Sequence, residues 1–259
     1  MTATETDLTL APIETRALKG DRSYQQDACD WARVTDPDTG RPVIVAAVAD
    51  GCGSGAGSGR IAKDAVSLAV RIAGTHGQAN LDRAIDAARE IIDERRPRRG
   101  RNDNSTLVLA YYDAAVLRVA WVGDSRAYAL TADGVLHQLT RDHNLAPYAP
   151  NQLTRALLGS LDHRHGDAWE GCESHTPQLA TPLLGSTLSP AARILLCTDG
   201  VCGPLSDEEI ASTLANTSDA STAARRLTSR AVRAARSAAS AMPEADNATA
   251  LVIDLGAVA

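Results

Sequence analysis

The amino-acid sequence predicts an α+β fold in which helices cover antiparallel sheets, and three observations support this prediction. Short segments with the two-residue period of strands gather between Thr106 and Leu139, separated by Asp-Ala and Asp-Gly pairs. One pair of segments with helical spacing precedes that stretch, and a second pair follows it. Strands and helices are therefore segregated along the chain, whereas a doubly wound parallel sheet would require them to alternate.

The elements expected before this meander begin with three strands. An unbroken apolar run at the third strand indicates burial on both faces, and a glycine-rich loop, Gly51–Gly59, follows it. Apolar residues spaced three and four apart then predict two helices. In chain order these elements are strands at Leu10–Leu18, Ala28–Val34 and Val43–Ala49 and helices at Ile61–Ile72 and Leu81–Ile92.

The second half of the chain opens with the antiparallel meander and closes with a single strand. The meander strands are expected at Thr106–Tyr112, Val116–Val122, Arg126–Leu130 and Val135–Leu139. Residues 141–192 are rich in loop-forming residues, with one helix expected near Leu153–Leu158. The elements expected after them are a strand at Ile194–Thr198, helices near Asp207–Leu214 and Ser221–Ala241, and a strand at Ala248–Leu255.

The composition is typical of one globular domain. The chain has 259 residues, of which 44% are hydrophobic and 22% charged, and such a chain is long enough to bury a substantial core. Residues 1–9 are polar, and we expect them to be disordered. We expect residues 10–259 to form a single domain.

Charge and targeting signals restrict the partners. The formal net charge of −6 argues against a nucleic-acid partner and against adhesion to an anionic membrane. The sequence shows neither a run of about 18 apolar residues nor a basic and apolar leader, so we expect a cytoplasmic protein. Five cysteines without a CxxC pair indicate neither a disulfide framework nor a zinc site.

Several aspartates stand where a strand ends or begins. Asp50 and Asp199 each follow an apolar run and precede a glycine. Asp246 precedes the last strand, and Asp124 lies between two meander strands. A carboxylate at the rim of the core is partly desolvated, which costs free energy unless a cation compensates its charge. Several such carboxylates, without histidine or cysteine, suit Mg²⁺ or Mn²⁺ rather than zinc.

These aspartates belong to a series of seven short motifs. The motifs read Arg22-Ser-Tyr-Gln-Gln-Asp27, Asp50-Gly-Cys-Gly-Ser54, Ser105-Thr-Leu-Val108, Gly123-Asp-Ser-Arg126, Leu139-Thr-Arg-Asp-His143, Thr198-Asp-Gly-Val201 and Asp246-Asn247. In content and order the series resembles the metal-dependent Ser/Thr protein phosphatases of the protein phosphatase 2C (PPM) family in its bacterial form. The resemblance extends over nearly the whole chain, from about Ala17 to Leu255.

The resemblance implies a four-layer α-β-β-α sandwich with two Mn²⁺ or Mg²⁺ ions bound at one end of the sheets. It implies that Asp50 bridges the two ions and that the carbonyl of Gly51 completes one ion's ligands. Asp199 and Asp246 would complete the ligands of the other ion. A third, weaker ion would be held by Asp124 with Asp199.

The resemblance also implies the activity. Arg22 would bind the substrate phosphate, for which the guanidinium fork is suited. Asp27 and Asn247 would not bind the ions directly but would support the residues that do. Asp27 would do so by holding a metal-bound water. Phosphoserine and phosphothreonine on proteins would be hydrolysed by a water that the two ions activate, with Arg22 and Asp50 as the catalytic residues. The expected partners are phosphorylated proteins and a bacterial Ser/Thr kinase that the enzyme opposes, and we expect a monomer. One branch of the family acts on anti-sigma-factor antagonists, and a substrate of that kind remains an alternative.

The sequence departs from the family pattern in the loop after Asp50. Cys52 stands where some members have a histidine proposed as general acid, and its thiol beside the ions is a candidate redox site. Ser54 replaces the usual second glycine, which places the geometry of this loop in question.

Two other functions remain open at this point. One is a non-catalytic module of the same fold that binds phosphoproteins. The other is dinucleotide binding, because the segment Gly51–Gly59 fits a glycine-rich pattern between a strand and a helix. No second parallel strand ending in an acid follows that pattern, which makes dinucleotide binding the weaker alternative.

Overall fold

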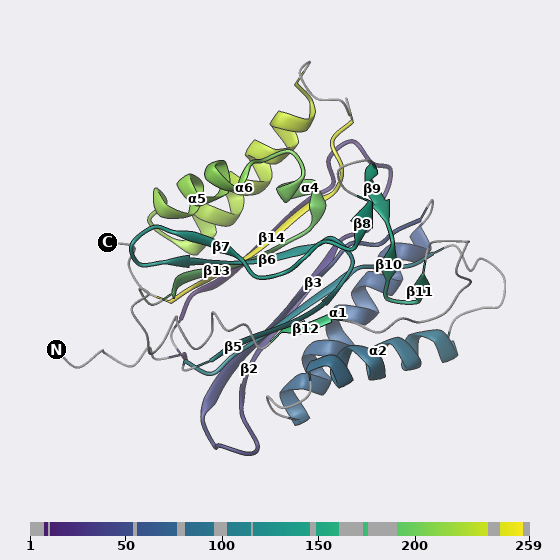
Figure 1. Cartoon of the computed structure of the whole chain (residues 1–259), viewed down its shortest axis with the longest axis vertical. Helices are drawn as coiled ribbons and strands as arrows, with labels where there is room; N and C mark the ends of the chain where they lie inside the picture. Colours follow the sequence, from purple (N-terminus) through teal and green to yellow (C-terminus); the bar gives the residue numbers. More distant parts are fainter. Residues whose placement is uncertain are drawn as a thin grey trace.

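The computed structural model describes residues 8–9, 11–53, 56–76, 81–95, 103–114, 116–145, 149–160, 173–175, 191–237 and 244–255. Two five-stranded antiparallel sheets lie face to face, and helices cover the outer face of each (Figure 1). The predicted α+β class and the four-layer sandwich are confirmed.

The first sheet has the strand order β1-β14-β13-β6-β7. Its strands are β1 (Ile13–Leu18), β6 (Arg126–Thr131), β7 (Leu136–Gln138), β13 (Ala191–Cys197) and β14 (Ala248–Asp254). The second sheet has the order β12-β5-β4-β3-β2. Its strands are β2 (Ala28–Thr35), β3 (Pro42–Ala49), β4 (Leu107–Tyr112), β5 (Leu117–Val122) and β12 (Glu173–His175).

The helices form the two outer layers. The second sheet is covered by α1 (Ala56–His76) and α2 (Leu81–Arg95), and the first by α4 (Asp199–Cys202), α5 (Asp207–Ala215) and α6 (Ala220–Ala235). Local chemistry fixes where two of them begin. Ser206 and Glu209 form a capping box at α5, and the Asp219 carboxylate accepts the backbone N–H of Thr222 at α6.

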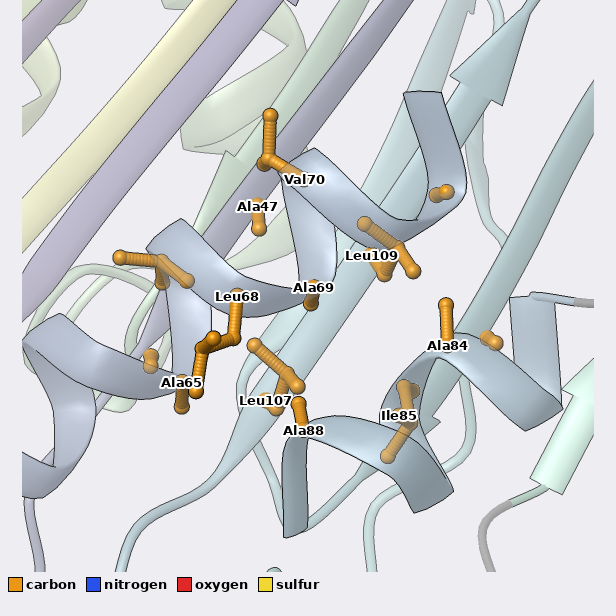
Figure 2. Packing of buried hydrophobic residues seen from close by; sticks show 14 of the residues in the cluster. Ala47, Ala65, Leu68, Ala69, Val70, Ala84, Ile85, Ala88, Leu107 and Leu109 are labelled. Carbon is orange, nitrogen blue, oxygen red and sulfur yellow. The ribbon is translucent and has the colours of Figure 1, made fainter. Parts of the chain in front are cut away.

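Three apolar layers hold the sandwich together. Figure 2 shows one of them, where Ala65 and Leu68 of α1 and Ile85 of α2 face Leu107 and Leu109 of β4. A second layer fills the space between the sheets, and a third lies under α4, α5 and α6. Because the chain has no phenylalanine, the largest fully buried side chains are Trp121, Tyr111 and Tyr128.

Each of these buried aromatics has a partner for its polar end. Tyr111 donates its hydroxyl hydrogen to Asp36, Tyr128 donates to Asp207 at 3.0 Å, and Trp121 Nε1 donates to the Arg141 carbonyl at 2.8 Å. A buried hydroxyl or indole N–H without such a partner would destabilise the fold. The aromatic core is therefore fixed in orientation as well as in packing.

The helix expected near Leu153–Leu158 is not present. This part of the chain instead forms the short strands β8 (Asn144–Leu145), β9 (Ala149–Leu153), β10 (Arg155–Ala156) and β11 (Gly159–Ser160). The strands β8 and β9 pair with each other, as do β10 and β11, and further backbone bonds reach outside the segment. The N–H of Leu157 donates to the Ser105 carbonyl, and the N–H of Leu158 donates to the Asn104 side chain, both at 2.8 Å. Tertiary partners thus override the apolar spacing that suggested a helix.

The other differences concern the ends of elements. Helix α6 ends at Ala235, and of the predicted continuation to residue 241, residues 238–241 lie outside the described part of the chain. Residues 1–7 of the segment expected to be disordered also lie outside it, but Leu8 is buried in the layer between the sheets. Within the described residues, no helix has the length and apolarity needed to cross a membrane.

Candidate active site

Asp50 follows the last residue of β3, and its backbone is fixed on both sides. Its N–H donates to the Thr106 hydroxyl at 2.9 Å, and its carbonyl accepts the N–H of Thr106 at 2.8 Å and the hydroxyl of Ser105 at 3.0 Å. The next residue, Gly51, is packed so closely that a Cβ there would lie 2.6 Å from the Ser58 backbone and 2.8 Å from the Gln26 carbonyl. These contacts hold the Asp50-Gly51 pair between the start of α1 and the segment before β2.

Asp199 follows β13 as the first residue of α4 and is linked to Asp27 through Thr198. The Thr198 hydroxyl donates to Asp27 Oδ2 at 2.9 Å, and the backbone N–H of Thr249 donates to the Thr198 hydroxyl oxygen at 3.0 Å. A Cβ on Gly200 would lie 1.8 Å from the Asn247 carbonyl. The glycine after Asp199 is therefore required for close packing between α4 and the start of β14.

Asn247 uses its whole side-chain amide to bind the segment that carries Arg22. Its Oδ1 accepts the N–H of Gln26 at 2.7 Å, and its Nδ2 donates to the carbonyls of Lys19 and Tyr24 at 2.6 and 3.1 Å. Arg22 Nη2 lies 2.6 Å from Asp246 Oδ2. The first and last motifs of the sequence, more than 200 residues apart, thus meet at this end of the sheets.

Asp124 lies in a loop that is fixed to the loop after β7. The N–H of Gly123 donates to His143 Nδ1 at 3.1 Å, and the N–H of His143 donates to the Gly123 carbonyl at 3.0 Å. Arg126 makes a two-point ion pair with Asp142 at 2.9 and 2.7 Å. Asp124 is almost entirely buried by this arrangement.

The aspartates of the site raise one another's pKa, because their negative charges act on one another. Burial raises the pKa of Asp50 well above its ordinary value, and the charges of four other carboxylates raise it further. In order of effect these are Asp199, Asp27, Asp246 and Asp124. The five predicted aspartates are therefore near enough to one another for their charges to interact.

Burial is also the largest cause of the raised pKa at three of the other aspartates. It raises the pKa of Asp27 to about 7, with Asp199 contributing, and that of Asp124 to about 8, again with Asp199 contributing. The pKa of Asp199 rises to about 6 through burial and then the charge of Asp246. A site in which carboxylates hold protons near neutral pH is short of positive charge.

The arginine at this site responds to the same cluster. Partial burial acts to lower the pKa of Arg22, but the charges of Asp246, Asp50 and Asp199 outweigh it, and the pKa is raised. The side chain keeps 44% of its surface exposed. Arg22 therefore lies at the open rim of the cluster, with its charge directed at the acids.

The donor set fits a hard divalent cation. It consists of carboxylate and carbonyl oxygens, as Mg²⁺ and Mn²⁺ prefer. Two of the carboxylate oxygens, Asp27 Oδ1 and Asp199 Oδ1, are buried without a hydrogen-bond partner among the described residues. As the side chains stand, no three His, Cys, Asp or Glu side chains of the described residues are grouped closely enough to hold an ion. An ion bound at Asp246 would compete with Arg22 for the same Oδ2 atom.

Cys52 lies beside the cluster, with its backbone N–H and carbonyl both bonded to Asn104 at 2.9 and 2.8 Å. Burial raises the pKa of its thiol well above the ordinary value, and the charges of Asp50, Asp124 and Asp199 raise it further. These surroundings favour the protonated thiol, which is the less reactive form. The redox role suggested for Cys52 stays a prediction.

Three residues that support the site were not singled out from the sequence. Thr198 orients Asp27, Asp142 pairs with Arg126, and Asn104 joins the Cys52 loop to Leu158. Thr198 and Asp142 lie inside the recognised motifs, so their positions were visible. Their pairing was not, because it depends on how the fold brings separate motifs together.

Comparisons with known proteins agree with the fold. The family described as Protein phosphatase 2C matches residues 19–235. The serine/threonine phosphatase PstP/Ppp of Mycobacterium tuberculosis is 24% identical, with a TM-score of 0.70 over 95% of this chain and 99% of that one. The PPM Ser-Thr phosphatase MsPP of Mycobacterium smegmatis, in complex with cacodylate, is 25% identical, with a TM-score of 0.68 over 95% and 98%.

The catalytic domain of PstP in complex with two manganese ions is similar as well, at 23% identity, a TM-score of 0.68 and coverage of 95% and 98%. No curated protein matches the sequence.

Proposed function

Because the chain belongs to the protein phosphatase 2C family, we propose that it is a metal-dependent phosphatase that removes phosphate from serine and threonine side chains of proteins. The observation that carries the proposal is that Asp27, Asp50, Asp124, Asp199 and Asp246, two of them buried and three half-buried, lie near enough to raise one another's pKa, with Arg22 at their rim. A cluster of this kind supplies cation ligands and an anion-binding group in the same place.

We propose that Asp50, the Gly51 carbonyl, Asp199 and Asp246 hold two Mn²⁺ or Mg²⁺ ions and that Asp124 with Asp199 holds a third, weaker one. When bound, two such ions supply Lewis-acid activation of a water and a clamp on phosphoryl oxygens. The two manganese ions in the similar PstP catalytic domain support this assignment.

The chain's own residues bind and orient the substrate. Arg22 offers exposed N–H donors beside the carboxylates, and a guanidinium binds two phosphate oxygens at once. Asp27 has one carboxylate oxygen bonded to Thr198 and the other without a partner among the described residues. That second oxygen is suited to accept a proton of the attacking water. Asn247 keeps the Arg22 segment in register with Asp246.

The dinucleotide alternative has no support in the fold. Strand β3 pairs with β2 and β4, and both pairings are antiparallel. The glycine-rich segment is therefore not part of a parallel βαβ unit, and the Asp50 charge beside it would repel a pyrophosphate. The non-catalytic module remains the alternative to test.

The test is hydrolysis of para-nitrophenyl phosphate and of phosphothreonine and phosphotyrosine peptides, with Mn²⁺ and with EDTA. We expect Mn²⁺-dependent release of phosphate, faster from phosphothreonine than from phosphotyrosine. Asp50→Asn should lower kcat on the order of 100-fold, whereas Asp64→Asn, at an exposed acid of α1, should leave it unchanged. Absence of hydrolysis together with phosphopeptide binding would show a binding module instead, and full activity of Asp50→Asn would exclude the proposed site.

A further inference from the structure

Helix α6 presents a basic face to solvent on a protein whose net charge is negative. Between Ala220 and Arg236 the chain has five arginines and no acidic residue, and α6 is the one described helix without an acid. All five arginines are exposed, while the opposite side of the helix packs on β1 and β14. They are Arg225, Arg226, Arg230, Arg233 and Arg236.

The helical period places these five arginines along one side of α6, and we call them the arginine row. Arg226, Arg230 and Arg233 follow one another at spacings of four and three residues, so their side chains lie in line. From Arg226 to Arg236 the row extends about 15 Å, roughly the length of five residues of extended peptide. In Figure 1, α6 lies on the outside of the molecule, and no element of the described part of the chain covers its outer side.

The row ends at the rim of the acid cluster. Arg236 binds Asp21 through three contacts of 2.6 to 3.1 Å, and Asp21 is the chain neighbour of Arg22. The N–H of Asp21 donates to the Ala245 carbonyl at 2.8 Å, and the N–H of Ala245 donates to Asp21 Oδ2 at 2.9 Å. The C-terminal end of α6 is therefore joined through Asp21 to the segment that carries Arg22, the proposed phosphate-binding residue.

Intramolecular ion pairs account for only part of this charge. Arg230 pairs with Glu209 of α5 at 3.3 Å, and Arg236 pairs with Asp21. Arg226 has a long contact of 3.5 Å to the Asn216 carbonyl. Among the described residues, no ion pair involves Arg225 or Arg233, and the sequence that follows the row, residues 237–243, contains no acid.

We propose that the arginine row of α6 is the docking surface for acidic residues that flank the phosphorylated side chain of the substrate protein. This inference rests on the proposed phosphatase function and specifies its substrate class. A phosphate held at Arg22 directs the neighbouring part of the substrate chain over Arg236 and toward Arg233 and Arg226. Carboxylates spaced along that part of the chain would pair with the exposed guanidinium groups. The row acts on binding and takes no part in the chemical step.

The experiment compares three substrates: para-nitrophenyl phosphate, a phosphothreonine peptide with neutral flanks and the same peptide with glutamates on both sides. The variant is Arg226→Glu/Arg233→Glu, two exposed positions that lie one above the other on the row. Its matched control is Arg71→Glu/Arg83→Glu on α1 and α2, in the opposite outer layer. Both double variants change the net charge by the same amount.

We expect wild-type protein to favour the acidic peptide over the neutral one. The α6 variant should lose about tenfold in kcat/KM for the acidic peptide, through KM, because two favourable exposed charge pairs become repulsive. Its activity on para-nitrophenyl phosphate should not change, and the control variant should behave as wild type. Raising NaCl from 50 to 500 mM should remove most of the preference, because salt screens exposed charges.

The proposal is overturned if active wild-type enzyme treats the two peptides alike, or if both double variants lose the same activity. A protein without any phosphatase activity would instead contradict the proposed function. The row would then be examined by the fluorescence anisotropy of the labelled acidic phosphopeptide, where weaker binding by the α6 variant alone still supports the docking surface. Equal affinity for double-stranded DNA would overturn it, since the row would then be a general polyanion surface.

Discussion

Replacing Asp124 by asparagine should stabilise the metal-free protein at pH 8. The pKa of Asp124 is raised from 3.8 to about 8, by burial first and by the charge of Asp199 next. A carboxyl whose folded-state pKa is raised contributes stability below its unfolded pKa and loses that contribution as the pH rises through the folded pKa. Asparagine keeps the shape and carries no charge, so the variant avoids the loss between about pH 4 and pH 8.

The magnitude follows from the size of the shift. One unit of pKa corresponds to about 1.4 kcal/mol, so the full shift would correspond to roughly 5–6 kcal/mol. Asp199 and Asp142 share the repulsion and relax when Asp124 loses its charge, and we therefore expect a gain of about 2–3 kcal/mol at pH 8. For a domain of this size that gain raises the Tm by about 5–10 °C.

The assay is thermal unfolding of chelator-treated protein at pH 8 and at pH 4.5. Asp124→Asn should melt higher than wild type at pH 8, and the difference should nearly vanish at pH 4.5, where the carboxyl is protonated in the folded state. Asp64→Asn, which removes the same charge from an exposed position on α1, should change the Tm little at either pH. A lower or unchanged Tm of Asp124→Asn at pH 8 would show that the cluster is not electrostatically strained.

Three further changes test the packing of the fold and of the site. Arg193→Ala should lower the free energy of unfolding in urea by about 3–5 kcal/mol. The reason is that the Asp254 carboxylate, now 3.1 Å from the guanidinium, loses its partner. A decrease below about 1 kcal/mol would contradict this. Gly200→Ala should weaken Mn²⁺ binding in calorimetry, since its Cβ would lie 1.8 Å from the Asn247 carbonyl; unchanged affinity would show that this approach is not needed. Ser206→Ala removes the α5 cap and should cost about 1 kcal/mol, and an unaltered midpoint of unfolding would argue against the capping box.

The sequence was sufficient to predict most of the fold because its periodicities are strong. The apolar run at β3 is buried from Val43 onward, and the helical spacing in α1 and α2 corresponds to faces that pack on the sheet. Where local pattern and tertiary contacts disagree, prediction failed. Leu153 and Leu157 are spaced as in a helix, but their segment forms short strand pairs, and the N–H groups of Leu157 and Leu158 donate to Ser105 and Asn104.

Four of the aspartates could be singled out because each stands beside a recognisable strand end, whereas Asp27 was indicated by the family resemblance. The supporting contacts could not, since they depend on which distant residues the sheets bring together. The bond of Thr198 to Asp27 joins residues 171 positions apart, and the ion pair of Arg22 with Asp246 joins residues 224 apart. The arginines of α6 are visible in the sequence, but the contact of Arg236 with Asp21 is not.

The most direct test of the site is a crystal structure of the protein soaked with Mn²⁺, with an anomalous difference map. We predict two strong peaks among Asp50, Asp199 and Asp246, a weaker one beside Asp124, and an Arg22 guanidinium that has left the Asp246 carboxylate. Peaks elsewhere, or no peaks with the ion pair of Arg22 and Asp246 intact, would contradict the assignment of this cluster as the catalytic metal site.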